Sequence, residues 1–370
     1  MIIGIDASRA FLKRRTGIEE YAYQTIKHLR SVVKESDTVI LYVRKKLVLK
    51  SIWFSVSVPE IDFELPKNWE VRPLWAPRFW TQIRLSIEMF LHSPDVLFVP
   101  AHTVPLIHPL RTIVTIHGLE YEFCKESYSF LDRLYMRLSI RFSCRVAETV
   151  ICVSENTKKD VMRLYGVLEE KIKVIYEGFE ENHSSIIAHQ LSVGNPYLLF
   201  IGRLEERKNI VRIIEAFEIL KEKYAIPHTL MLAGKPGHNY ERIQFKIQNS
   251  KFKIFIKELG YISEEEKWEL LKNADVFLFP SLYEGFGIPV LEAQSVGVPV
   301  VTSNISSLPE VGGEGAVYVD PNDAESIADG IQSVLSDKAR RDDIIVKATQ
   351  NVSCFSWTRC AEEISLIFDK

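Results

Sequence analysis

The sequence predicts an α/β protein of two domains, each built on an open and mostly parallel β-sheet. Short apolar runs alternate with longer segments of helical periodicity, which is typical of βαβ units, and this alternation starts again near residue 196. A chain of 370 residues is too long for one comfortable hydrophobic core and suits two. Its 46% hydrophobic and 26% charged residues are ordinary for a globular protein and argue against disorder.

The first half of the chain contains six short apolar runs that we interpret as strands. They are Ile2–Asp6, Val39–Val43, Val96–Pro100, Thr112–Ile116, Thr149–Val153 and Lys173–Tyr176. Helical patterns lie between them, at Gly17 to about Lys34, about Gln82 to Leu91, about Phe130 to Ala147, and Glu155–Tyr165.

The second half repeats this organisation. Strands are expected at Tyr197–Gly202, Thr229–Ala233, Val276–Pro280, Val298–Thr302 and Ala316–Val319. Helices are expected at Ile210–Lys223, Glu264–Asn273, Pro289–Val296 and Ala324–Leu335, and Ser263 with Glu266 forms a plausible capping box.

The segment Phe179–Asn195 is polar and has no stable period, so we interpret it as the linker between the halves. The predicted domains are therefore 1–180 and 196–354, followed by a last helix over 355–370. Open α/β sheets place ligands at the carboxyl ends of their strands, here facing a cleft between the domains.

Composition excludes several classes of function. The net charge of −3 gives no reason to expect a nucleic-acid partner. The five cysteines are scattered without a CxxC pair, which indicates reduced thiols in a cytosolic protein. We expect no signal peptide, because the first residues lack a basic start followed by a long apolar stretch, and no apolar run approaches the 18 residues of a membrane span.

The most informative stretch is FPSLYEGFGIPVLEAQSVGVPVV, residues 279–301. A buried strand ends there in a glycine-containing turn, and Pro289 suits the first turn of a following helix. The helix start favours bound oxygen atoms, and ionised Glu284 and Glu292 can each accept hydroxyl groups of a sugar. Either glutamate alone is more often an ordinary surface residue, but the combination with the glycines and proline favours a sugar-binding site.

Two cations follow the first strand of the second half in GRLEERKN. As two fixed cations, Arg203 and Lys208 can stabilise negative charge on a bound phosphate group. A charged turn of this kind is usually only solvated, but its place between a strand and a helix favours the phosphate-binding interpretation.

These stretches resemble retaining glycosyltransferases of the GT-B fold, in particular family 4, whose motif has two glutamates eight positions apart. Residues 198–217, 230–237, 259–281 and 303–321 resemble the family in order and spacing. The resemblance implies two Rossmann-like domains and a C-terminal helix that crosses back to the first domain. It implies catalytic roles for Glu284, Arg203, Lys208 and His117. It also implies donor binding by Gly17, Gly202, Gly260, Tyr261, Ile262, Gly285, Phe286, Gly287, Ile288 and Glu292.

The first half resembles the family more loosely. Gly17 matches the glycine of a loop near the donor phosphate, although Glu19 and Glu20 depart from the family pattern, and the turn alone accounts for the glycine equally well. His117, in TIHGLEYEF, matches a histidine beside the transferred sugar.

The mechanism implied by the resemblance retains the anomeric configuration, with the donor phosphate accepting the proton of the acceptor. The sequence has no Asp-x-Asp metal motif and no zinc-ligand spacing, so we expect no metal requirement. Glu284 would bind a hydroxyl group, and Glu284→Gln is expected to reduce transfer and leave folding intact.

The sequence leaves substrate and location as hypotheses. The best single donor is GDP-mannose, with a UDP-sugar as the other possibility, and the acceptor is a glycan or polyprenyl-diphosphate-linked glycan. A sugar-nucleotide epimerase and a non-catalytic sugar-nucleotide-binding protein are alternatives, whereas the absence of GxGxxG disfavours an oxidoreductase. Arginines at every fourth position from Arg133 to Arg145 indicate either an ordinary surface or peripheral contact with anionic lipid at the inner membrane face.

Overall fold

The computed structural model describes residues 1–13, 15–50, 53–57, 59–75, 80–180 and 196–369. The chain divides into two compact units, which we describe separately. The N-terminal unit contains Met1–Leu119, Leu134–Gly178 and Ser356–Lys370, and the C-terminal unit contains Glu120–Arg133 and Phe179–Phe355. The short segment Glu120–Arg133 thus belongs by its contacts to the C-terminal unit, although it lies in the first half of the sequence.

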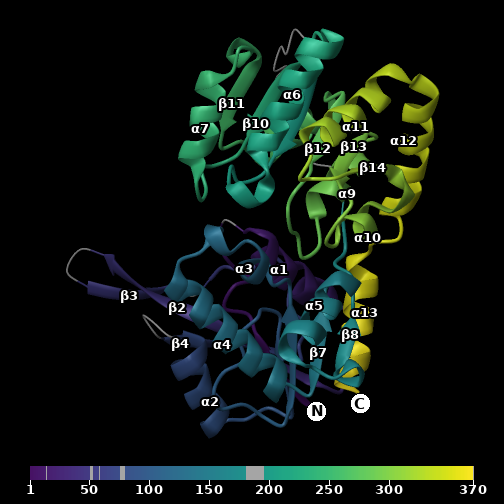
Figure 1. Ribbon diagram of the computed structural model, residues 1–370. Helices are drawn as coiled ribbons and strands as arrows, with labels where there is room; N and C mark the ends of the chain where they lie inside the picture. The colour runs from purple at the N-terminus through teal and green to yellow at the C-terminus, as the bar shows by residue number, and fades with distance from the viewer. Residues whose placement is uncertain (14, 51–52, 58, 76–79, 181–195, 370) are drawn as a thin grey trace. The chain divides into compact units, whose positions relative to one another are not determined.

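The described sheet of the N-terminal unit is parallel except at one edge. Its strands follow the order β3-β2-β1-β5-β6-β7-β8, and β4 pairs with β2 (Figure 1). Only the β2–β3 pair is antiparallel. The strands are β1 (Ile2–Asp6), β2 (Thr38–Lys50), β3 (Trp53–Ser57), β4 (Trp69–Trp75), β5 (Val96–Val99), β6 (Arg111–Ile116), β7 (Thr149–Cys152) and β8 (Ile172–Val174).

Helices cover this sheet and connect its parallel strands. They are α1 (Gly17–Leu29), η1 (Trp80–Leu85), α2 (Ser86–Leu91), α4 (Phe130–Val146), α5 (Glu155–Tyr165) and α13 (Trp357–Phe368). Helix α1 begins at a capping box, in which Thr16 and Glu19 satisfy each other's backbone amides. The segment from Trp80 begins with a wider π-helical turn before it continues as α2.

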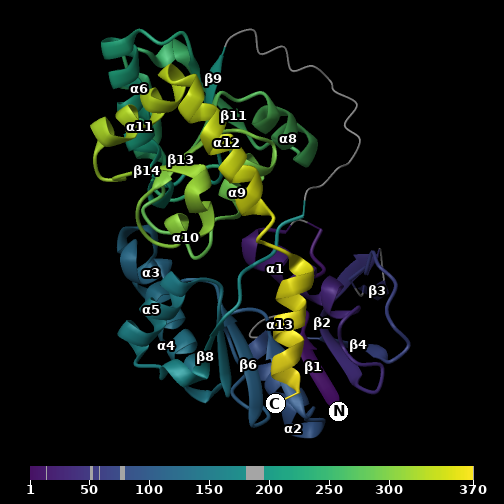
Figure 2. The same cartoon turned by 90° about the vertical axis from the view of Figure 1, so that its right-hand side faces the viewer.

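The C-terminal helix α13 packs on the N-terminal unit, as the sequence predicts. It runs alongside α1 (Figure 2), and Trp357 contacts the ring of Tyr21 with 5.9 Å between centroids. Gly178 lies so close to the Trp357 backbone that an added Cβ would come within 2.1 Å of its nitrogen. This close approach explains why a glycine stands where the chain leaves the unit.

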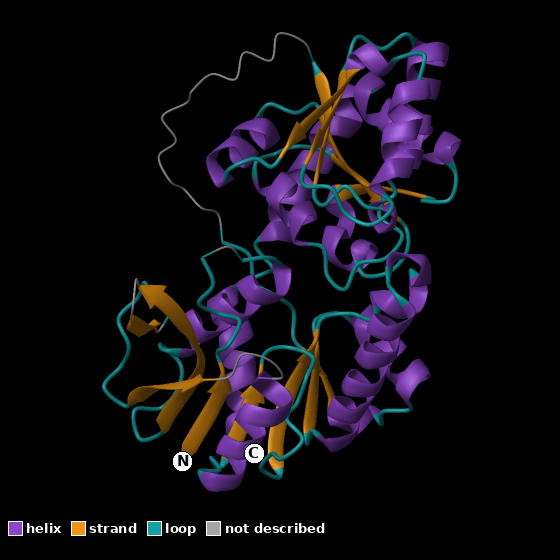
Figure 3. Cartoon of the chain, turned by 90° about the vertical axis from the view of Figure 1, so that its left-hand side faces the viewer, coloured by secondary structure: helices purple, strands orange, loops and turns teal. Residues whose placement is uncertain are grey.

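The C-terminal unit is a doubly wound sheet with helices on both faces (Figure 3). Its six described strands are all parallel, in the order β11-β10-β9-β12-β13-β14. They are β9 (Tyr197–Ile201), β10 (Thr229–Ala233), β11 (Ile256–Gly260), β12 (Val276–Phe279), β13 (Val300–Ser303) and β14 (Ala316–Val319). The central strands are buried over their whole length, which gives the apolar runs seen in the sequence.

The helices of this unit are α6 (Ile210–Tyr224), α7 (Tyr240–Asn249), α8 (Glu264–Lys272), α9 (Ile288–Ser295), α10 (Leu308–Gly312), α11 (Ala324–Ser336) and α12 (Lys338–Val352). The capping box predicted at Ser263 and Glu266 is present at the start of α8. Helices α7 and α12 and strand β11 were not predicted, because each buries few side chains. In α12, for example, only Ile344 and Ala348 are buried.

Two further sequence predictions need comment. The predicted strand Val39–Val43 is the first part of a longer β2, and β3 and β4 beside it were missed. The predicted linker Phe179–Asn195 lies outside the described residues from 181 onwards. All five cysteines are described and none forms a disulfide.

Candidate active site

A buried ion pair joins two of the predicted catalytic residues in the C-terminal unit. Lys208 donates from Nζ to Oε1 of Glu284 at 2.5 Å, and both side chains are 11% exposed. Lys208 ends the short helical turn after β9, and Glu284 follows β12, its neighbour in the sheet. Parallel neighbouring strands therefore bring the two motifs to the same edge, as the sequence predicts from its strand–loop–helix pattern.

Arg207 completes this cluster and was missed in the sequence analysis. One of its nitrogens contacts Oε2 of Glu284 at 3.0 Å and donates to the carbonyl of Tyr283 at 2.8 Å. Its other terminal nitrogen donates to Glu205 at 2.9 Å. Arg207 thus contacts one carboxylate oxygen of Glu284 and Lys208 contacts the other. The position of Arg207 next to Lys208 in RLEERKN could have indicated that Arg207 belongs to the site.

The charges in the cluster keep Glu284 ionised. Burial alone would raise the pKa of its carboxyl, but Arg207 and Lys208 outweigh burial and hold the pKa at about 2. Burial also lowers the pKa of Lys208, although the neighbouring carboxylate acts in the opposite direction. The carboxylate of Glu284 therefore stays ionised near neutral pH, held by the side chains of Arg207 and Lys208.

The backbone of Glu284 is held as firmly as its side chain. Its amide donates to Ser306 Oγ at 3.0 Å, and Ser306 and Ser307 donate to its carbonyl at 2.5 and 2.9 Å. Both serines lie in SNISSLPE after β13, a stretch that the sequence analysis noted without assigning a role. Gly287, with φ of 128°, then begins α9 in a conformation that L side chains rarely adopt.

Arg203 lies apart from this cluster. It is exposed at the carboxyl end of β9, and within the described part of the chain it makes no ion pair. The loop that carries it is packed tightly, since a Cβ on Gly234 would come within 1.7 Å of the Gly202 carbonyl oxygen. The predicted convergence of four charges is thus present for Lys208 and Glu284, while Arg203 is an exposed cation earlier in the same connection between β9 and α6.

Glu292 has a separate partner. Lys267 of α8 donates to its carboxylate at 2.9 Å and also contacts Glu264. Glu292 lies one turn into α9, and its side chain is 15% exposed. The two glutamates of the motif therefore pair with different cations. The spacing of the motif did not predict this difference.

The remaining predicted donor-binding residues differ in exposure. Gly260 ends β11 with φ of 68° and Tyr261 is 62% exposed, with Lys235 over its ring. Ile262 packs against the core of the unit. Phe286 is buried against Phe355, so its backbone rather than its ring can meet a ligand at the start of α9, where Gly285 and Ile288 are half-buried.

A segment from the first half of the sequence contributes to this unit. Phe123, at the end of α3 (Glu120–Phe123), stacks on Tyr283 with 4.6 Å between ring centroids. Tyr128 donates a hydrogen bond to Glu120. Both groups lie close enough to Arg207 to raise the pKa of its guanidinium group. The stretch TIHGLEYEF is therefore divided between the two units, with His117 in one and Phe123 in the other.

His117 and Gly17 lie in the N-terminal unit. Nδ1 of His117 contacts Glu177 at 3.2 Å, and Nε2 contacts the carbonyl of Pro100 at 3.0 Å. Both ring nitrogens thus have partners within the unit, and its predicted role beside the sugar stays a prediction. Gly17 has an ordinary φ, and a Cβ there would meet nothing within 4 Å. Its own backbone therefore does not require a glycine.

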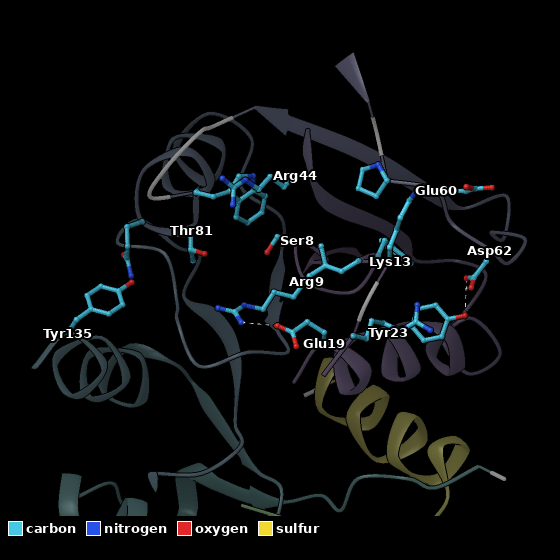
Figure 4. A pocket seen from close by; sticks show the side chains of 16 residues that line it. Ser8, Arg9, Lys13, Glu19, Tyr23, Arg44, Glu60, Asp62, Thr81 and Tyr135 are labelled. Atoms are coloured by element: carbon cyan, nitrogen blue, oxygen red, sulfur yellow. Dashed lines mark hydrogen bonds and ion pairs between the residues drawn. The ribbon is translucent and has the colours of Figure 1, made fainter. Parts of the chain in front are cut away.

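A cavity of about 1400 Å³ opens at the carboxyl edge of β1 and β2 in the N-terminal unit (Figure 4). Arg9 pairs with Glu19 at 3.3 Å, and Tyr23 donates to Asp62 at 2.9 Å. The lining contains four cations, three carboxylates and four aromatic residues, and the sequence analysis did not predict a site there. It consists of Ser8, Arg9, Phe11, Leu12, Lys13, Arg15, Glu19, Tyr23, Arg44, Pro59, Glu60, Asp62, Trp80, Thr81, Gln82 and Tyr135.

Two negative findings concern the described residues alone. They contain no group of three or more histidine, cysteine or acidic side chains that could hold a metal ion. They also contain no helix that is long and apolar enough to cross a lipid bilayer.

Comparisons with known proteins identify the family of the chain. The model of glycosyl transferases group 1 matches residues 184–351, and that of Glycosyltransferase Family 4 matches residues 15–183. The chain is 30% identical over 262 residues to O-antigen chain mannosyltransferase B of Escherichia coli, covering 68% of each chain. It is 26% identical over 324 residues to O-antigen chain mannosyltransferase RfbU of Salmonella typhimurium, covering 87% and 88%.

Among solved structures, Anabaena Alr3699/HepE in complex with UDP and glucose superposes with a TM-score of 0.70 at 17% identity. The match covers 100% of this chain and 99% of that one. At this identity the likeness bears on the fold alone.

Proposed function

The chain belongs to the group 1, family 4 glycosyltransferases of GT-B fold, and from this premise we propose that it transfers a hexose from a nucleotide sugar to a glycan. The observation that carries the proposal is the buried cluster of Glu284, Lys208 and Arg207 beside the start of α9. It offers cations for a diphosphate and a fixed carboxylate for sugar hydroxyl groups.

The ion pairs in the cluster suggest how donor binding would proceed. A diphosphate carries about two negative charges and would compete with Glu284 for Lys208. Arg207 is also held by Glu205 and by the Tyr283 carbonyl, so it would keep the carboxylate in place. Glu284 would then exchange its contact with Lys208 for hydroxyl groups of the transferred sugar.

We propose mannose from GDP-mannose as the donor. Two relatives, the O-antigen chain mannosyltransferases of Escherichia coli and Salmonella typhimurium, support mannose. The structure of Alr3699/HepE with UDP and glucose supports a nucleotide sugar in general and makes a UDP-sugar the competing donor. A second glutamate, Glu292, would bind the ribose of either nucleotide.

Transfer would proceed with retention and without a metal ion. The acceptor oxygen bonds to the anomeric carbon on the face from which the diphosphate departs, and the acceptor proton passes to the departing phosphate oxygen. Lys208 and the exposed Arg203 would supply the positive charge that stabilises the leaving group. Glu284 forms no covalent bond in this scheme.

The cavity of the N-terminal unit is our candidate for the acceptor site. Arg9, Ser8, Thr81 and Arg44 surround one part of it, and Lys13 with Glu60 and Asp62 surrounds the other (Figure 4). Tyr135, which is 54% exposed, can stack on a sugar ring, and the cations suit a phosphate group. A glycan linked to a polyprenyl diphosphate has both features. We accordingly propose a cytoplasmic enzyme that works at the inner membrane face.

Proton NMR of the purified protein with a panel of sugar nucleotides tests the proposal. GDP-mannose, UDP-glucose, UDP-galactose and UDP-N-acetylglucosamine are each incubated with a short-chain lipid-diphosphate glycan, with EDTA present. We expect an α-linked mannosyl product from GDP-mannose alone. Product from a UDP-sugar would overturn the choice of donor, and a β-linked product would overturn retention. An isomerised donor without transfer, or no reaction with any donor, would overturn the function.

A further inference from the structure

Asn209 joins the turn that carries Lys208 to the start of helix α6. Its φ of 64° lies in the left-handed region, which glycine and asparagine adopt more readily than other residues. The residue is 4% exposed, so its polar side chain lies inside the C-terminal unit. A glycine would make this turn equally well. The turn by itself therefore does not account for a buried amide group at this position.

The side-chain amide of Asn209 donates two hydrogen bonds to buried backbone. Nδ2 donates to the carbonyl of Pro280 at 3.0 Å and to the carbonyl of Pro321 at 2.7 Å. Pro280 directly follows β12, and Pro321 lies two residues after β14. The NH2 group of an amide offers two donors on one atom, which matches two carbonyl acceptors. Asn209 thus bonds the connection after β9 to the connections after two other strands of the same sheet.

Arg212 fixes the direction in which this amide points. Its Nη1 donates to Oδ1 of Asn209 at 3.4 Å, and its Nε donates to the carbonyl of Asn322 at 3.1 Å. A guanidinium group can only donate, so the amide oxygen faces Arg212 and the NH2 group faces the two proline carbonyls. The orientation of the amide therefore follows from all of its partners together.

Lys208 lies between two bonds to the segment that follows β12. The amide of Leu282 donates to the carbonyl of Arg207 at 2.9 Å. On the other side of Lys208 in the chain, Asn209 donates to Pro280. The first bond joins backbone to backbone, whereas the second is made by the side chain of Asn209. A substitution at Asn209 can therefore remove one of the two bonds and leave the other in place.

We infer that Asn209 is a positioning residue, whose amide keeps Lys208 within reach of Glu284. Nζ of Lys208 contacts Oε1 of Glu284 at 2.5 Å, and a contact this short requires both connections to stay in register. Without the amide, the connection after β9 would be held to the segment after β12 on one side of Lys208 instead of both. The inference rests on the proposed function for its effect on transfer, but not for the position of Lys208.

Acylation of lysine side chains, followed by mass spectrometry of the peptides, tests the position of Lys208 without any substrate. Asn209→Gly keeps the turn and removes the amide. We expect Lys208 to be acylated roughly tenfold faster in this variant, because two hydrogen bonds are lost. Lys267 is the internal control, since its side chain is 14% exposed against 11% for Lys208 and is paired with Glu292 in the same unit. The rate at Lys267 should not change.

Asn239→Gly is the matched control variant. Asn239 also has a positive φ, of 56°, but its amide donates to the side chain of Glu206, which Arg242 holds independently. This variant should leave both acylation rates at their wild-type values. Equal acceleration at the two lysines in Asn209→Gly would indicate a general loss of stability and would overturn the inference. An unchanged rate at Lys208 would overturn it as well.

Steady-state kinetics measure the consequence for sugar transfer. For Asn209→Gly, kcat should fall roughly thirtyfold while the KM for the donor changes less than about threefold, because a displaced charge affects the transition state most. In a Lys208→Ala background the same substitution should lower kcat less than about twofold, because it acts through Lys208. Losses that multiply in full in the double variant would show that Asn209 acts independently of Lys208, against the inference.

Arg212→Met provides a milder test if Asn209→Gly does not fold. It leaves the buried amide in place and removes the group that orients it. Acylation of Lys208 should then be roughly threefold faster and kcat roughly threefold lower. If the wild type transfers no sugar, the proposed function fails, yet the acylation rates still decide the position of Lys208. An active wild type whose Asn209→Gly variant has unchanged kcat would overturn the inference and leave the proposed function standing.

Discussion

The two candidate sites of the molecule handle charge in opposite ways. In the C-terminal unit, Glu284 and Lys208 are buried and paired with each other, with Arg207 completing the cluster. In the N-terminal unit, the side chain of Arg9 lines the cavity, is 54% exposed and forms an ion pair with Glu19. The buried cluster already satisfies its charges, so a ligand must exchange one partner for another. The exposed cations of the cavity can meet a ligand at little cost.

This difference teaches that stability and function are coupled in one site and separable in the other. Removing one member of a buried ion pair leaves an uncompensated charge and costs about 3–5 kcal/mol. An exposed pair is worth about 0–1 kcal/mol. Removing one partner of an ion pair should therefore reduce the stability more in the C-terminal site than in the N-terminal cavity.

The largest effect is expected for Glu284→Gln. Transfer should fall at least roughly a hundredfold, because the fixed carboxylate is lost from the site. The free energy of unfolding should also fall by about 3 kcal/mol, since Arg207 and Lys208 lose their shared anion. The buried ion pairs thus lead to a different expectation from the sequence alone, which predicts that this variant leaves folding intact. Steady-state kinetics and thermal denaturation check both effects.

Glu314→Gln is the matched control, because the Glu314 side chain is 85% exposed in the same unit. It should retain the activity and melting temperature of the wild type. Wild-type transfer by Glu284→Gln would contradict the assigned role.

A comparison of Lys208→Ala with Arg203→Ala should separate the effect of losing a buried cation from the effect of losing an exposed one. Both should weaken transition-state stabilisation by about 2–4 kcal/mol, as expected for a lost charge donor at a departing diphosphate. Only Lys208→Ala should lower the melting temperature, because it leaves Glu284 with one partner fewer in a buried site. Calorimetry showing unchanged nucleotide binding in both variants would argue against a phosphate site here.

Lowering the pH should reveal how much the same cluster contributes to the stability of the wild type. The pKa of Glu284 is about 2, below its ordinary value of 4.5. Its contribution to stability is therefore complete above about pH 4.5 and is lost as the pH falls toward 2. The difference in melting temperature between wild type and Glu284→Gln should shrink over that range. A difference that stays constant down to pH 2.5 would contradict the depressed pKa.

Glu292→Gln should give a smaller effect. Its partner Lys267 keeps its contact with Glu264, so the free energy of unfolding should fall by only about 1 kcal/mol. If Glu292 binds the ribose, the KM for the donor should rise roughly tenfold with little change in kcat. A fall in kcat at unchanged KM would place Glu292 nearer the reacting atoms.

The smallest change in stability is expected for Arg9→Gln. The free energy of unfolding should stay within about 0.5 kcal/mol, because the side chain is half exposed. The KM for a phosphate-bearing acceptor should rise roughly fivefold with unchanged donor binding. Lys34→Gln, another exposed cation of this unit, serves as control. An unchanged acceptor KM would remove the cavity as the acceptor site.

Strong local patterns made much of the fold predictable. The buried strands β9, β10 and β12 appear as continuous apolar runs, and Ser263 with Glu266 marks the start of α8. By contrast, β11 has only one buried residue, so no apolar pattern marks it. The family itself follows from the strand–loop–helix motifs, which two family models and the curated relatives support.

The sequence by itself determined that Lys208 and Glu284 would meet, because each follows a strand of one parallel sheet. Only the tertiary structure decided that Arg207 would hold the same carboxylate, that Lys267 would neutralise Glu292, and that Phe123 would stack on Tyr283. These contacts join residues up to 160 positions apart. Their pairing depends on side-chain direction and on the exact path of loops, which local periodicity does not encode.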